Sequence, residues 1–334
     1  MRAIVVEKHG GPAVLQDSEW PDPSPGPGQL LVDVAASGVN FMDIYQREGR
    51  PPYAGGLPYV PGAEGAGTVA AVGSGVSGFA EGDRVAWTSV PGSYADRAVI
   101  PADRAVPVPG GVELEVAAAV MLQGMTAHYL SHSTYPVAPG DPVVVHAAAG
   151  GVGLLLTQMA AARGGTVIAT ASTSEKAELA RAAGAGRAAG YQDFGAVVRE
   201  VTGGSGAAAV YDGVGQATFD ASLAALRQRG YMILYGAASG PVPPFELQRL
   251  AAGGSLFITR PTLVDYIASR GELLQRAADL FSWISNGQLT VHIGARYPLA
   301  DAPRAHDDLA ARRTAGKLLL LPADPSRRWR RGIS

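Results

Sequence analysis

The stretch Asp141–Gly153 constrains the fold of this 334-residue chain more than any other. It reads DPVVVHAAAGGVG: a short β-branched run, a turn of small residues, and then the first residues of an apolar helix pattern. Pro142 can open a strand but cannot lie in its middle, and the run Val143–Val145 is typical of a strand covered on both faces. A strand that leads through glycines into a helix indicates the first βα unit of a dinucleotide-binding sheet.

The small residues of this turn have separate roles in such a motif. Ala148 stands where the first glycine is often found, Gly150 lets a pyrophosphate approach the backbone, and Gly153 lets the helix pack close to the strand. The helix N-terminus offers N–H groups and the positive end of its dipole to phosphate. We therefore predict a cofactor site at Ala148, Gly150, Gly151, Val152 and Gly153. An ordinary tight βα turn is the alternative.

The periodicity of the remaining chain predicts two domains of an α/β protein. Strand and helix patterns alternate from residue 126 to 263, with a second strand at Thr166–Thr170, which predicts a doubly wound parallel sheet. Residues 1–125 show short strand patterns at about 10-residue spacing, among them Arg84–Thr88 and Tyr94–Ile100, which favours a twisted, barrel-like sheet. Residues 264–322 supply a helix and the apolar run Lys317–Leu321, which we expect to return as a strand to the first domain. We expect the basic end, residues 323–334, to be flexible.

The composition narrows the classes of function. The chain has no cysteine, which excludes disulfides, thiolate metal sites and a cysteine nucleophile. The net charge of −2 gives no general attraction to nucleic acid or to a membrane surface. No apolar run reaches the ~20 residues of a membrane helix, and the N-terminus lacks a signal-peptide pattern. We expect a cytoplasmic protein without a membrane or nucleic-acid partner.

The residues at the end of the second predicted Rossmann strand indicate whether the protein binds NADH or NADPH. Residues 171–176 read ASTSEK at a place where NAD-binding proteins usually present Asp or Glu to the ribose hydroxyls. Ser172, Thr173 and Lys176 can instead bind a 2′-phosphate, so we predict NADPH. We expect Glu175 to point away on the first helical turn. The alternative is that these residues only cap a helix and stay solvated.

Two later strands end at the same carboxyl edge, where ligands bind in open α/β folds. The first ends in VYDGVG at residues 210–215, and the second ends in residues 235–239. Tyr235, Gly236 and Ser239 are therefore candidate contacts of the nicotinamide half of the cofactor. Each segment could equally be a simple strand-to-helix turn.

Four motifs together resemble one known family. They are GVNFMDIY at residues 38–45, PGAEGAG at 61–67, HAAAGGVG at 146–153 and ITRP at 258–261. From Met1 to about Pro322 the chain resembles the zinc-free quinone oxidoreductases of the medium-chain dehydrogenase/reductase superfamily, the ζ-crystallin-like group. The resemblance implies a GroES-like catalytic domain, a Rossmann domain, NADPH, and a homodimer joined through Rossmann sheet edges near Leu256–Thr259.

The same resemblance implies the residues of the active site. Asn40 and Tyr45 would lie at the nicotinamide and suit hydrogen bonding to the acceptor oxygen, while Asp43 would either tie the loop together or transfer a proton. Further implied cofactor contacts are Asn40 itself, Tyr129, Tyr191, Arg260 and Arg313.

The chain also departs from the family pattern. Relatives often continue as Tyr-x-Arg-x-Gly-x-Tyr, whereas here Pro51 intervenes and the next tyrosine is Tyr53. We therefore expect an aromatic wall of the acceptor site to be shifted or lost, with Tyr53 as a further candidate site residue. Ala237 stands where relatives often have asparagine, which removes one polar contact.

The zinc ligands of the superfamily are missing from the sequence. Zinc members have Cys at the position of Asn40 and a His-Glu pair where this chain has Ala63-Glu64. His128 and His132 have helical i, i+4 spacing but no third ligand nearby, and we expect them on a solvated or capping face. We expect no metal, so the hydride must go to an acceptor that is already electrophilic, such as a quinone or an α,β-unsaturated carbonyl.

Three functions remain open, in a clear order. We predict an NADPH-dependent quinone reductase. The second reading is an NADPH-dependent enone or alkenal double-bond reductase, which must also deliver a proton to carbon and for which the sequence shows no clear donor. The third is an NADPH-binding structural or RNA-binding protein, which no patch of basic and aromatic residues supports.

Overall fold

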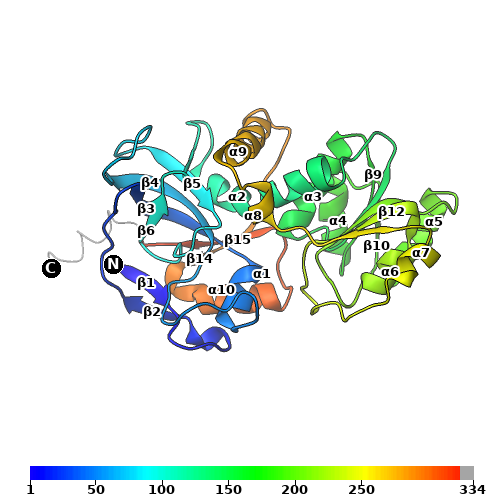
Figure 1. Cartoon of the computed structure of the whole chain (residues 1–334), viewed down its shortest axis with the longest axis horizontal. Coiled ribbons are helices and arrows are strands. Elements are labelled where there is room, and N and C mark those ends of the chain that lie inside the picture. The colour runs from blue at the N-terminus through cyan, green and yellow to red at the C-terminus, as the bar shows by residue number, and fades with distance from the viewer. Residues whose placement is uncertain (324–334) are drawn as a thin grey trace. The chain divides into compact units, whose positions relative to one another are not determined.

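A computed structural model of the chain describes residues 1–323 (Figure 1). Its contacts divide the chain into unit 1, which comprises Met1–Leu122 and the residues from Ser269 onward, and unit 2, Gln123–Ala268. Unit 2 is therefore one continuous segment set within the sequence of unit 1. The sequence pattern placed these boundaries at 125/126 and 263/264. The basic end that we expected to be flexible lies, beyond residue 323, outside the described residues.

Unit 2 is built on a six-stranded parallel sheet in the order β10-β9-β8-β11-β12-β13. The strands are β8 (Pro142–Val145), β9 (Thr166–Thr170), β10 (Arg187–Ala189), β11 (Ala207–Asp212), β12 (Leu226–Leu234) and β13 (Phe257–Thr259). Numbered from β8, this order is 3-2-1-4-5-6, which confirms the predicted Rossmann sheet. The order reverses between β8 and β11, so a ligand is expected outside the carboxyl ends of these two strands.

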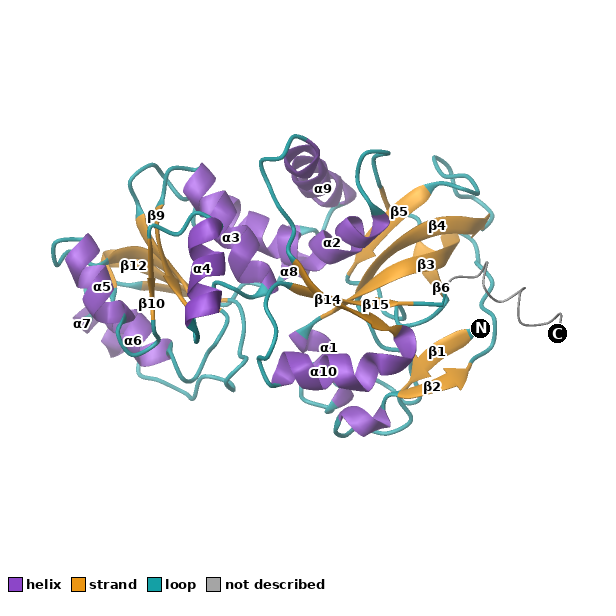
Figure 2. Ribbon diagram, turned by 180° about the vertical axis from the view of Figure 1, so that it is seen from behind, coloured by secondary structure: helices purple, strands orange, loops and turns teal. Residues whose placement is uncertain are grey.

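Unit 2 also contains the helices α3 (Gly151–Ala162), α4 (Ser174–Ala182), α5 (Phe194–Val201), α6 (Phe219–Ala224), α7 (Gln248–Ala252) and α8 (Leu263–Tyr266). Four of them, α3 to α6, pack on its sheet, where α3 contacts α4 and α5 contacts α6 (Figure 2). Val144, Ile168 and Val210 of the sheet share one buried cluster with Phe194 of α5 and Phe219 of α6. Burial of one such phenylalanine contributes about 1.5–3 kcal/mol. This packing fixes the strand ends on which the site depends.

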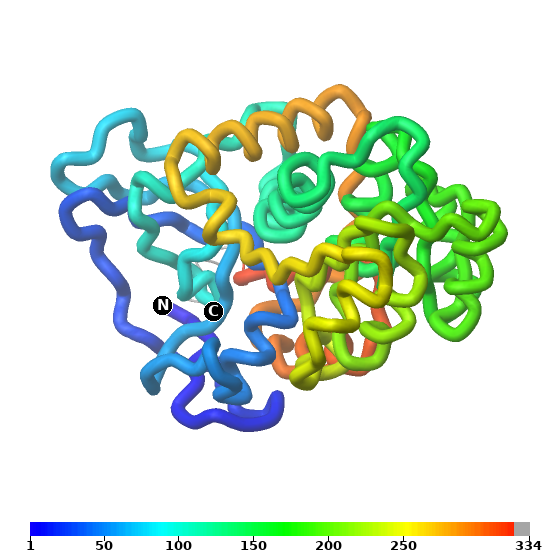
Figure 3. The backbone as a smooth tube through the Cα atoms, turned by 45° about the vertical axis from the view of Figure 1, so that its right-hand side comes forward, coloured from blue at the N-terminus to red at the C-terminus, as the bar shows by residue number. Residues whose placement is uncertain are grey.

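Unit 1 contains a larger sheet with strands from both of its sequence segments (Figure 3). Its path is β14-β15-β3-β4-β5-β7, with β6 also paired to β3, and β1 and β2 form a separate two-stranded sheet. The strands are β1 (Arg2–Val5), β2 (Gln16–Glu19), β3 (Gln29–Val39), β4 (Glu64–Val72), β5 (Arg84–Thr88), β6 (Arg97–Pro101), β7 (Val106–Pro107), β14 (Ile293–Pro298) and β15 (Lys317–Leu321). The C-terminal strand β15 thus runs antiparallel to β3, between β3 and β14.

Five helices of α or 3₁₀ type complete the described part of unit 1. They are η1 (Pro12–Val14), α1 (Phe41–Arg47), α9 (Arg270–Ser285), η3 (Leu299–Asp301) and α10 (Ala302–Ala310). The helix α2 (Leu114–Tyr129) crosses the boundary between the units in sequence and ends in a π-helical turn, η2 (Leu130–Thr134). No helix in residues 1–323 has the length and apolar character that a bilayer span requires.

Some elements differ from the sequence-based expectation. The strand expected from Tyr94 begins only at Arg97, because Tyr94 instead points into a buried cluster with Ile4 and Leu320. The strand β10 and the helix α5 were not predicted. β10 is only three residues long, too short for a periodic pattern to indicate.

Candidate active site

The glycine turn of unit 2 follows β8 at the point where the strand order reverses. Ala147 has a φ of 49°, a left-handed conformation that side chains other than glycine rarely adopt. Backbone hydrogen bonds hold it on both sides: the N–H of His146 bonds to the Tyr211 carbonyl, and that of Ala148 to the Thr170 carbonyl, both at 3.0 Å. The 12-residue helix α3 then begins at Gly151. Its first N–H groups have no partners within the helix and suit a phosphate.

The glycines of the turn are required by close packing. A Cβ atom on Gly153 would lie 2.7 Å from the Cα atom of Ala148, which cannot move aside because it is backbone. A Cβ on Gly150 would come within 3.1 Å of the Ala147 carbonyl oxygen. A Cβ on Gly151 would collide with the side chain of Gln123 on α2. The sequence analysis did not identify Gln123 as a neighbour of this turn. The turn therefore exposes backbone without side chains, as a pyrophosphate site needs.

A buried histidine, His146, stabilises this turn through hydrogen bonds within unit 2. His146 has no exposed surface, and its Nδ1 and Nε2 atoms each lie 2.9 Å from a hydroxyl, those of Thr170 and Ser222 respectively. Burial lowers the pKa of His146 to about 4, so the imidazole is neutral near pH 7. The histidine thereby links the ends of β8 and β9 to α6. Sequence reasoning gave it no role, because its partners are 24 and 76 residues away.

The carboxylate of Asp212 continues this network at the end of β11. Its Oδ1 accepts the backbone N–H groups of Val214 at 2.7 Å and Gly215 at 2.9 Å, and its Oδ2 accepts the hydroxyl of Thr218 at 2.7 Å. Ser222, which contacts His146, also donates to Asp212 at 3.2 Å. The carboxylate is fully buried and fixes the turn that follows β11.

The end of β12 packs tightly on the same turn. A Cβ on Gly236 would lie 2.6 Å from the Gly213 carbonyl oxygen, and the Tyr235 ring fills the space above Gly213. The Ser239 hydroxyl donates to the Val214 carbonyl at 2.7 Å and accepts the Ala217 N–H at 3.0 Å. Tyr235, Gly236 and Ser239 thus hold the two turns together at the carboxyl edge. Their contact with a cofactor remains a prediction.

The tip of β9 presents the residues predicted to bind a 2′-phosphate. Thr173 caps α4, and its hydroxyl oxygen accepts the N–H of Lys176 at 3.3 Å. Glu175 does not point away as we expected. Its carboxylate accepts hydrogen bonds from its own N–H and from the Thr173 hydroxyl, and these hold its pKa below the ordinary value. The donors of a helix N-terminus attract any anion, so Glu175 occupies groups that a 2′-phosphate would use.

The four remaining residues predicted to contact the cofactor lie in different surroundings. Tyr129 is buried and stacks on Tyr266, with ring centroids 4.1 Å apart, and the ring of Tyr191 lies 6.0 Å from that of His146. The Arg260 guanidinium donates to the Pro261 carbonyl at 3.3 Å. These three belong to unit 2. Arg313 belongs to unit 1, where it pairs with Asp308 at 2.7 Å.

In unit 1, the predicted acceptor residue Asn40 belongs to a closed ring of polar groups. Its amide Nδ2 donates to Glu64 Oε1 at 2.7 Å, and its Oδ1 accepts from the Lys317 ammonium at 2.9 Å. Lys317 and Glu64 also form a direct ion pair. All three side chains are buried. Sequence reasoning missed Lys317, because a lysine at the start of an apolar strand is usually solvated.

A second buried network holds the backbone of Asn40. Asp43 accepts the Asn40 N–H at 2.8 Å and the Tyr94 hydroxyl at 3.1 Å. The Tyr94 oxygen lies 3.1 Å from Nε2 of His306, whose Nδ1 lies 3.3 Å from the Arg47 guanidinium. Burial raises the pKa of Asp43 to about 7 and lowers that of His306 to about 3. Of the two roles considered for Asp43, these contacts favour the structural one, in which its side chain fixes the loop at Asn40.

The two tyrosines of the predicted aromatic wall lie together. The ring centroids of Tyr45 and Tyr53 are 5.4 Å apart, and the Arg50 guanidinium carbon lies 5.3 Å from the centre of the Tyr45 ring. Phe41 is a further neighbour of Tyr45 at 6.3 Å. Although the sequence around Pro51 departs from the family pattern, Tyr45 and Tyr53 still form an aromatic cluster, and the Arg50 guanidinium lies over the Tyr45 ring.

The residues at the zinc positions of the superfamily do not fit zinc. Asn40 and Glu64 are already bonded to the Lys317 ammonium, a cation that would repel a metal ion placed between them. Within residues 1–323 there is no cluster of three or more His, Cys, Asp or Glu side chains able to hold a metal. His128 is buried and its ring stacks on that of His132 at 4.5 Å, so the expectation of a solvated face is wrong for His128.

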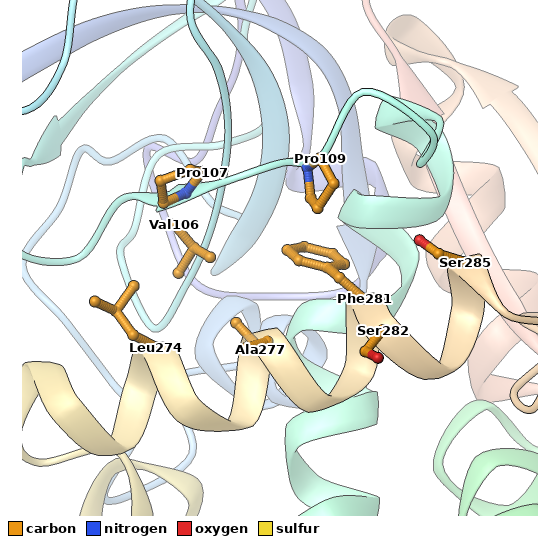
Figure 4. A pocket seen from close by; sticks show the side chains of 9 residues that line it. Val106, Pro107, Pro109, Leu274, Ala277, Phe281, Ser282 and Ser285 are labelled. Atoms are coloured by element: carbon orange, nitrogen blue, oxygen red, sulfur yellow. The ribbon is translucent and has the colours of Figure 1, made fainter.

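An apolar groove of about 450 Å³ lies elsewhere in unit 1, between α9 and the segment around β7 (Figure 4). Val106, Pro107, Leu274, Ala277 and Phe281 contribute most of its apolar wall. None of the predicted site residues lines it, and it offers no charged group. The candidate chemistry therefore lies with the two clusters described above.

Two parts of the chain match the sequence models of known protein families. Residues 26–110 match an alcohol dehydrogenase GroES-like domain, and residues 151–282 match a zinc-binding dehydrogenase domain. The first falls within unit 1. The second covers most of unit 2 and continues into α9 of unit 1.

Several characterised proteins are similar over nearly the whole length. The quinone oxidoreductase of Pseudomonas aeruginosa is 44% identical over 96% of this chain and 99% of its own. The 2-haloacrylate reductase of a Burkholderia species is 43% identical over 96% of this chain and 98% of its own. A mycobacterial protein solved in complex with NADPH is 52% identical, with a TM-score of 0.93 over 96% of this chain and 100% of that protein.

Proposed function

The chain belongs to the zinc-free quinone oxidoreductase family of the medium-chain dehydrogenase/reductase superfamily, and on that premise we propose that it reduces quinones with NADPH. The observation that carries the proposal is the pair of sites described above. Unit 2 offers a glycine turn and a helix N-terminus that fit a dinucleotide, and unit 1 holds an oriented amide beside two tyrosines. The overall reaction converts NADPH, a proton and a quinone into NADP⁺ and a hydroquinone.

The cofactor is NADPH, which supplies the hydride when bound. The N–H groups at the start of α3 bind the pyrophosphate, and Gly150 and Gly153 keep that approach open. Thr173 and Lys176, with Ser172, would hold the 2′-phosphate, at the place where the Thr173 hydroxyl now donates to the Glu175 carboxylate. Tyr235 and Ser239 hold the turns at the nicotinamide end in place.

The acceptor is bound by residues of unit 1. Asn40 donates a hydrogen bond to the oxygen on which negative charge develops as hydride reaches the ring. Tyr45 and Tyr53 pack against the flat faces or edges of the quinone. Asp43 fixes the backbone at Asn40 and the start of α1 rather than touching the acceptor, because its side chain is fully buried. No Lewis acid is needed, because a quinone is already electrophilic.

A second candidate function rests on one observation. A relative 43% identical over nearly the full length is named as a reductase of 2-haloacrylate, a compound with an activated carbon–carbon double bond. Double-bond reduction uses the same hydride but must also protonate carbon. An NADPH-binding structural or RNA-binding role is the third and least supported reading.

The test follows NADPH absorbance with purified protein and two acceptors in parallel, a simple 1,4-quinone and a simple enone. NADH in place of NADPH is the control for the cofactor. Faster turnover of the quinone is expected. A clear preference for the enone moves the function to double-bond reduction, and binding of NADPH without turnover of either acceptor overturns the assignment of an acceptor.

We also propose a homodimer joined through β13. This strand is the edge of the described Rossmann sheet, and Phe257 on it is 49% exposed although it is a large apolar residue. Sedimentation of the wild type should give a dimer, and Phe257→Glu should shift it toward monomer. A monomeric wild type contradicts the proposal. The cytoplasmic location also stays a proposal, supported by a chain without cysteine and testable by cell fractionation.

A further inference from the structure

Arg50 follows helix α1 and lies over the first tyrosine of the predicted aromatic wall. Its guanidinium carbon is 5.3 Å from the centre of the Tyr45 ring, which is within the range of a cation–π contact. The Arg50 side chain is 51% exposed, whereas that of Arg47, in the last turn of α1, is only 2% exposed. Of these two guanidinium groups, Arg50 is therefore the one that a dissolved molecule can reach.

The end of α1 explains why Arg50 is found beside Tyr45. The Gly49 N–H donates to the Gln46 carbonyl at 3.0 Å. The Arg50 N–H donates to the Tyr45 carbonyl at 2.9 Å. These two bonds form a Schellman motif, with Gly49 in the left-handed conformation at a φ of 70°. In this motif the residue after the glycine typically packs against the residue whose carbonyl it binds, and here these are Arg50 and Tyr45.

Gly49 and the turn that follows it fix this geometry. A Cβ on Gly49 would lie 2.8 Å from Cγ of His9, in addition to the strain of a positive φ. The Arg50 carbonyl then accepts the N–H of Tyr53 at 2.8 Å. This turn brings the centre of the Tyr53 ring back to 5.4 Å from that of Tyr45. Backbone hydrogen bonds thus place one guanidinium and two aromatic rings side by side.

The charges around Arg50 leave an excess of positive charge at this wall. Glu48 pairs with Arg47 through Oε1 at 2.9 Å and with Arg50 through Oε2 at 2.5 Å, and one carboxylate cannot neutralise two guanidinium groups. Asp307 also attracts Arg47, but Asp307 is exposed, so solvent screens its charge. A guanidinium carries five N–H donors. In the described part of the chain Glu48 contacts the Nη2 end of Arg50, so an anion can approach through Nε and Nη1.

We propose that Arg50 is a specificity-determining residue of the acceptor site and that it favours quinones carrying an anionic substituent, such as a sulfonate or a carboxylate. This proposal rests on the proposed function, in which Tyr45 and Tyr53 pack against the quinone. A quinone that lies on these rings brings a substituent at its edge close to the Arg50 guanidinium. The attraction contributes to binding of the acceptor, so it acts on KM more than on kcat.

The test compares 1,4-naphthoquinone with its 2-sulfonate as acceptors in NADPH oxidation. The measured quantity is kcat/KM for the sulfonate divided by kcat/KM for the parent quinone. Because each variant is compared with wild type, the different intrinsic reactivities of the two quinones cancel. Arg50→Met keeps a long side chain over Tyr45 without its charge, and the ratio should fall about tenfold, as for the loss of one hydrogen bond to a charged group. Arg50→Lys keeps the charge and should restore most of the ratio.

Two further variants separate recognition of an anion from support of the wall. Glu48→Gln removes the carboxylate that competes for Arg50, so the ratio should rise, in the direction opposite to Arg50→Met. Arg304→Met on α10 is the matched control, because Arg304 also lies over a tyrosine, Tyr297, at 5.9 Å and also faces a carboxylate, Asp308, at 3.8 Å. Its ratio should equal that of wild type. Added salt should lower the wild-type ratio toward that of Arg50→Met.

The outcomes separate the inference from the function on which it rests. A wild type that binds NADPH but reduces neither quinone overturns the proposed function, and the inference with it. An equal loss for both quinones in Arg50→Met shows that Arg50 only supports the Tyr45 ring, which overturns the inference alone. A ratio that stays at the wild-type value in Arg50→Met, or that does not rise in Glu48→Gln, also overturns the inference while leaving quinone reduction in place.

Discussion

The replacement His306→Gln should change how the stability of unit 1 depends on pH. His306 lies between Tyr94 and Arg47 in a buried network that also includes Asp43. Burial, with the nearby Arg47 charge, lowers its pKa to about 3, whereas an unfolded histidine has a pKa of about 6.5. Between these values the unfolded state binds one more proton than the folded state. The contribution of His306 to the stability of the wild type must therefore fall as the pH drops below 6.5.

The size of the effect follows from the two pKa values. At pH 5 the extra proton on unfolded His306 costs the folded state about 2 kcal/mol, and each further unit costs about 1.4 kcal/mol. At pH 7.5 the variant should instead be less stable by about 2 kcal/mol, because the glutamine amide cannot place its oxygen and nitrogen where both imidazole nitrogens lie, which weakens the buried hydrogen bonds to Arg47 and Tyr94. Wild type and variant should thus have similar free energies of unfolding near pH 5. Asp43 has a raised pKa and acts in the opposite direction, but it is present in both proteins.

Denaturant unfolding followed by tryptophan fluorescence is the suitable assay. Trp20, Trp87 and Trp283 belong to unit 1, and unit 2 contains no tryptophan, so the signal reports on the unit that contains His306. His292→Gln, at an exposed position, is the control for the same replacement outside the buried network. A difference between His306→Gln and wild type that stays constant from pH 8 to pH 5 would refute the reasoning, since it would show that His306 titrates alike in both states.

Three further predictions concern unit 2. Lys176→Ala should weaken NADPH binding far more than NADH binding in calorimetric titration, and equal losses would remove the 2′-phosphate assignment. Gly153→Ala should lower the free energy of unfolding by about 1–3 kcal/mol, because its Cβ meets the backbone of Ala148, and should weaken NADPH as well; unchanged binding would contradict the tight turn. Asp212→Ala should cost about 1–3 kcal/mol, because the buried N–H groups of Val214 and Gly215 lose their acceptor, and a stability equal to wild type would count against the network.

The sequence indicated the fold well where structure depends on local pattern. The strands β5, β9 and β15 have the predicted bounds, and the parallel sheet of unit 2 follows from the alternation of strands and helices. The glycine turn could be predicted from the sequence, because the strand, the glycines and the helix that define it lie within a few residues of one another.

The buried polar networks could not be predicted in the same way. Lys317 bonds to Glu64 across 253 residues and His306 to Arg47 across 259, and no periodicity links such positions. From the sequence alone we would place such residues at the surface, both a lysine at the edge of an apolar run and a lone histidine. The orientation of Glu175 was wrong for a related reason, since the donors of a helix end act only once the helix exists.

The place of Lys317 near the end of the chain has a consequence for biosynthesis. Glu64 leaves the ribosome 253 residues before its partner, so it has no counter-ion for roughly 10–50 s at ordinary rates of translation. Its strand cannot bury the carboxylate stably during that time, and β3 also lacks its neighbour β15. Unit 2, being continuous, can fold while synthesis continues. A truncation before residue 317 should therefore yield a nascent protein whose Rossmann unit resists protease while its other unit does not.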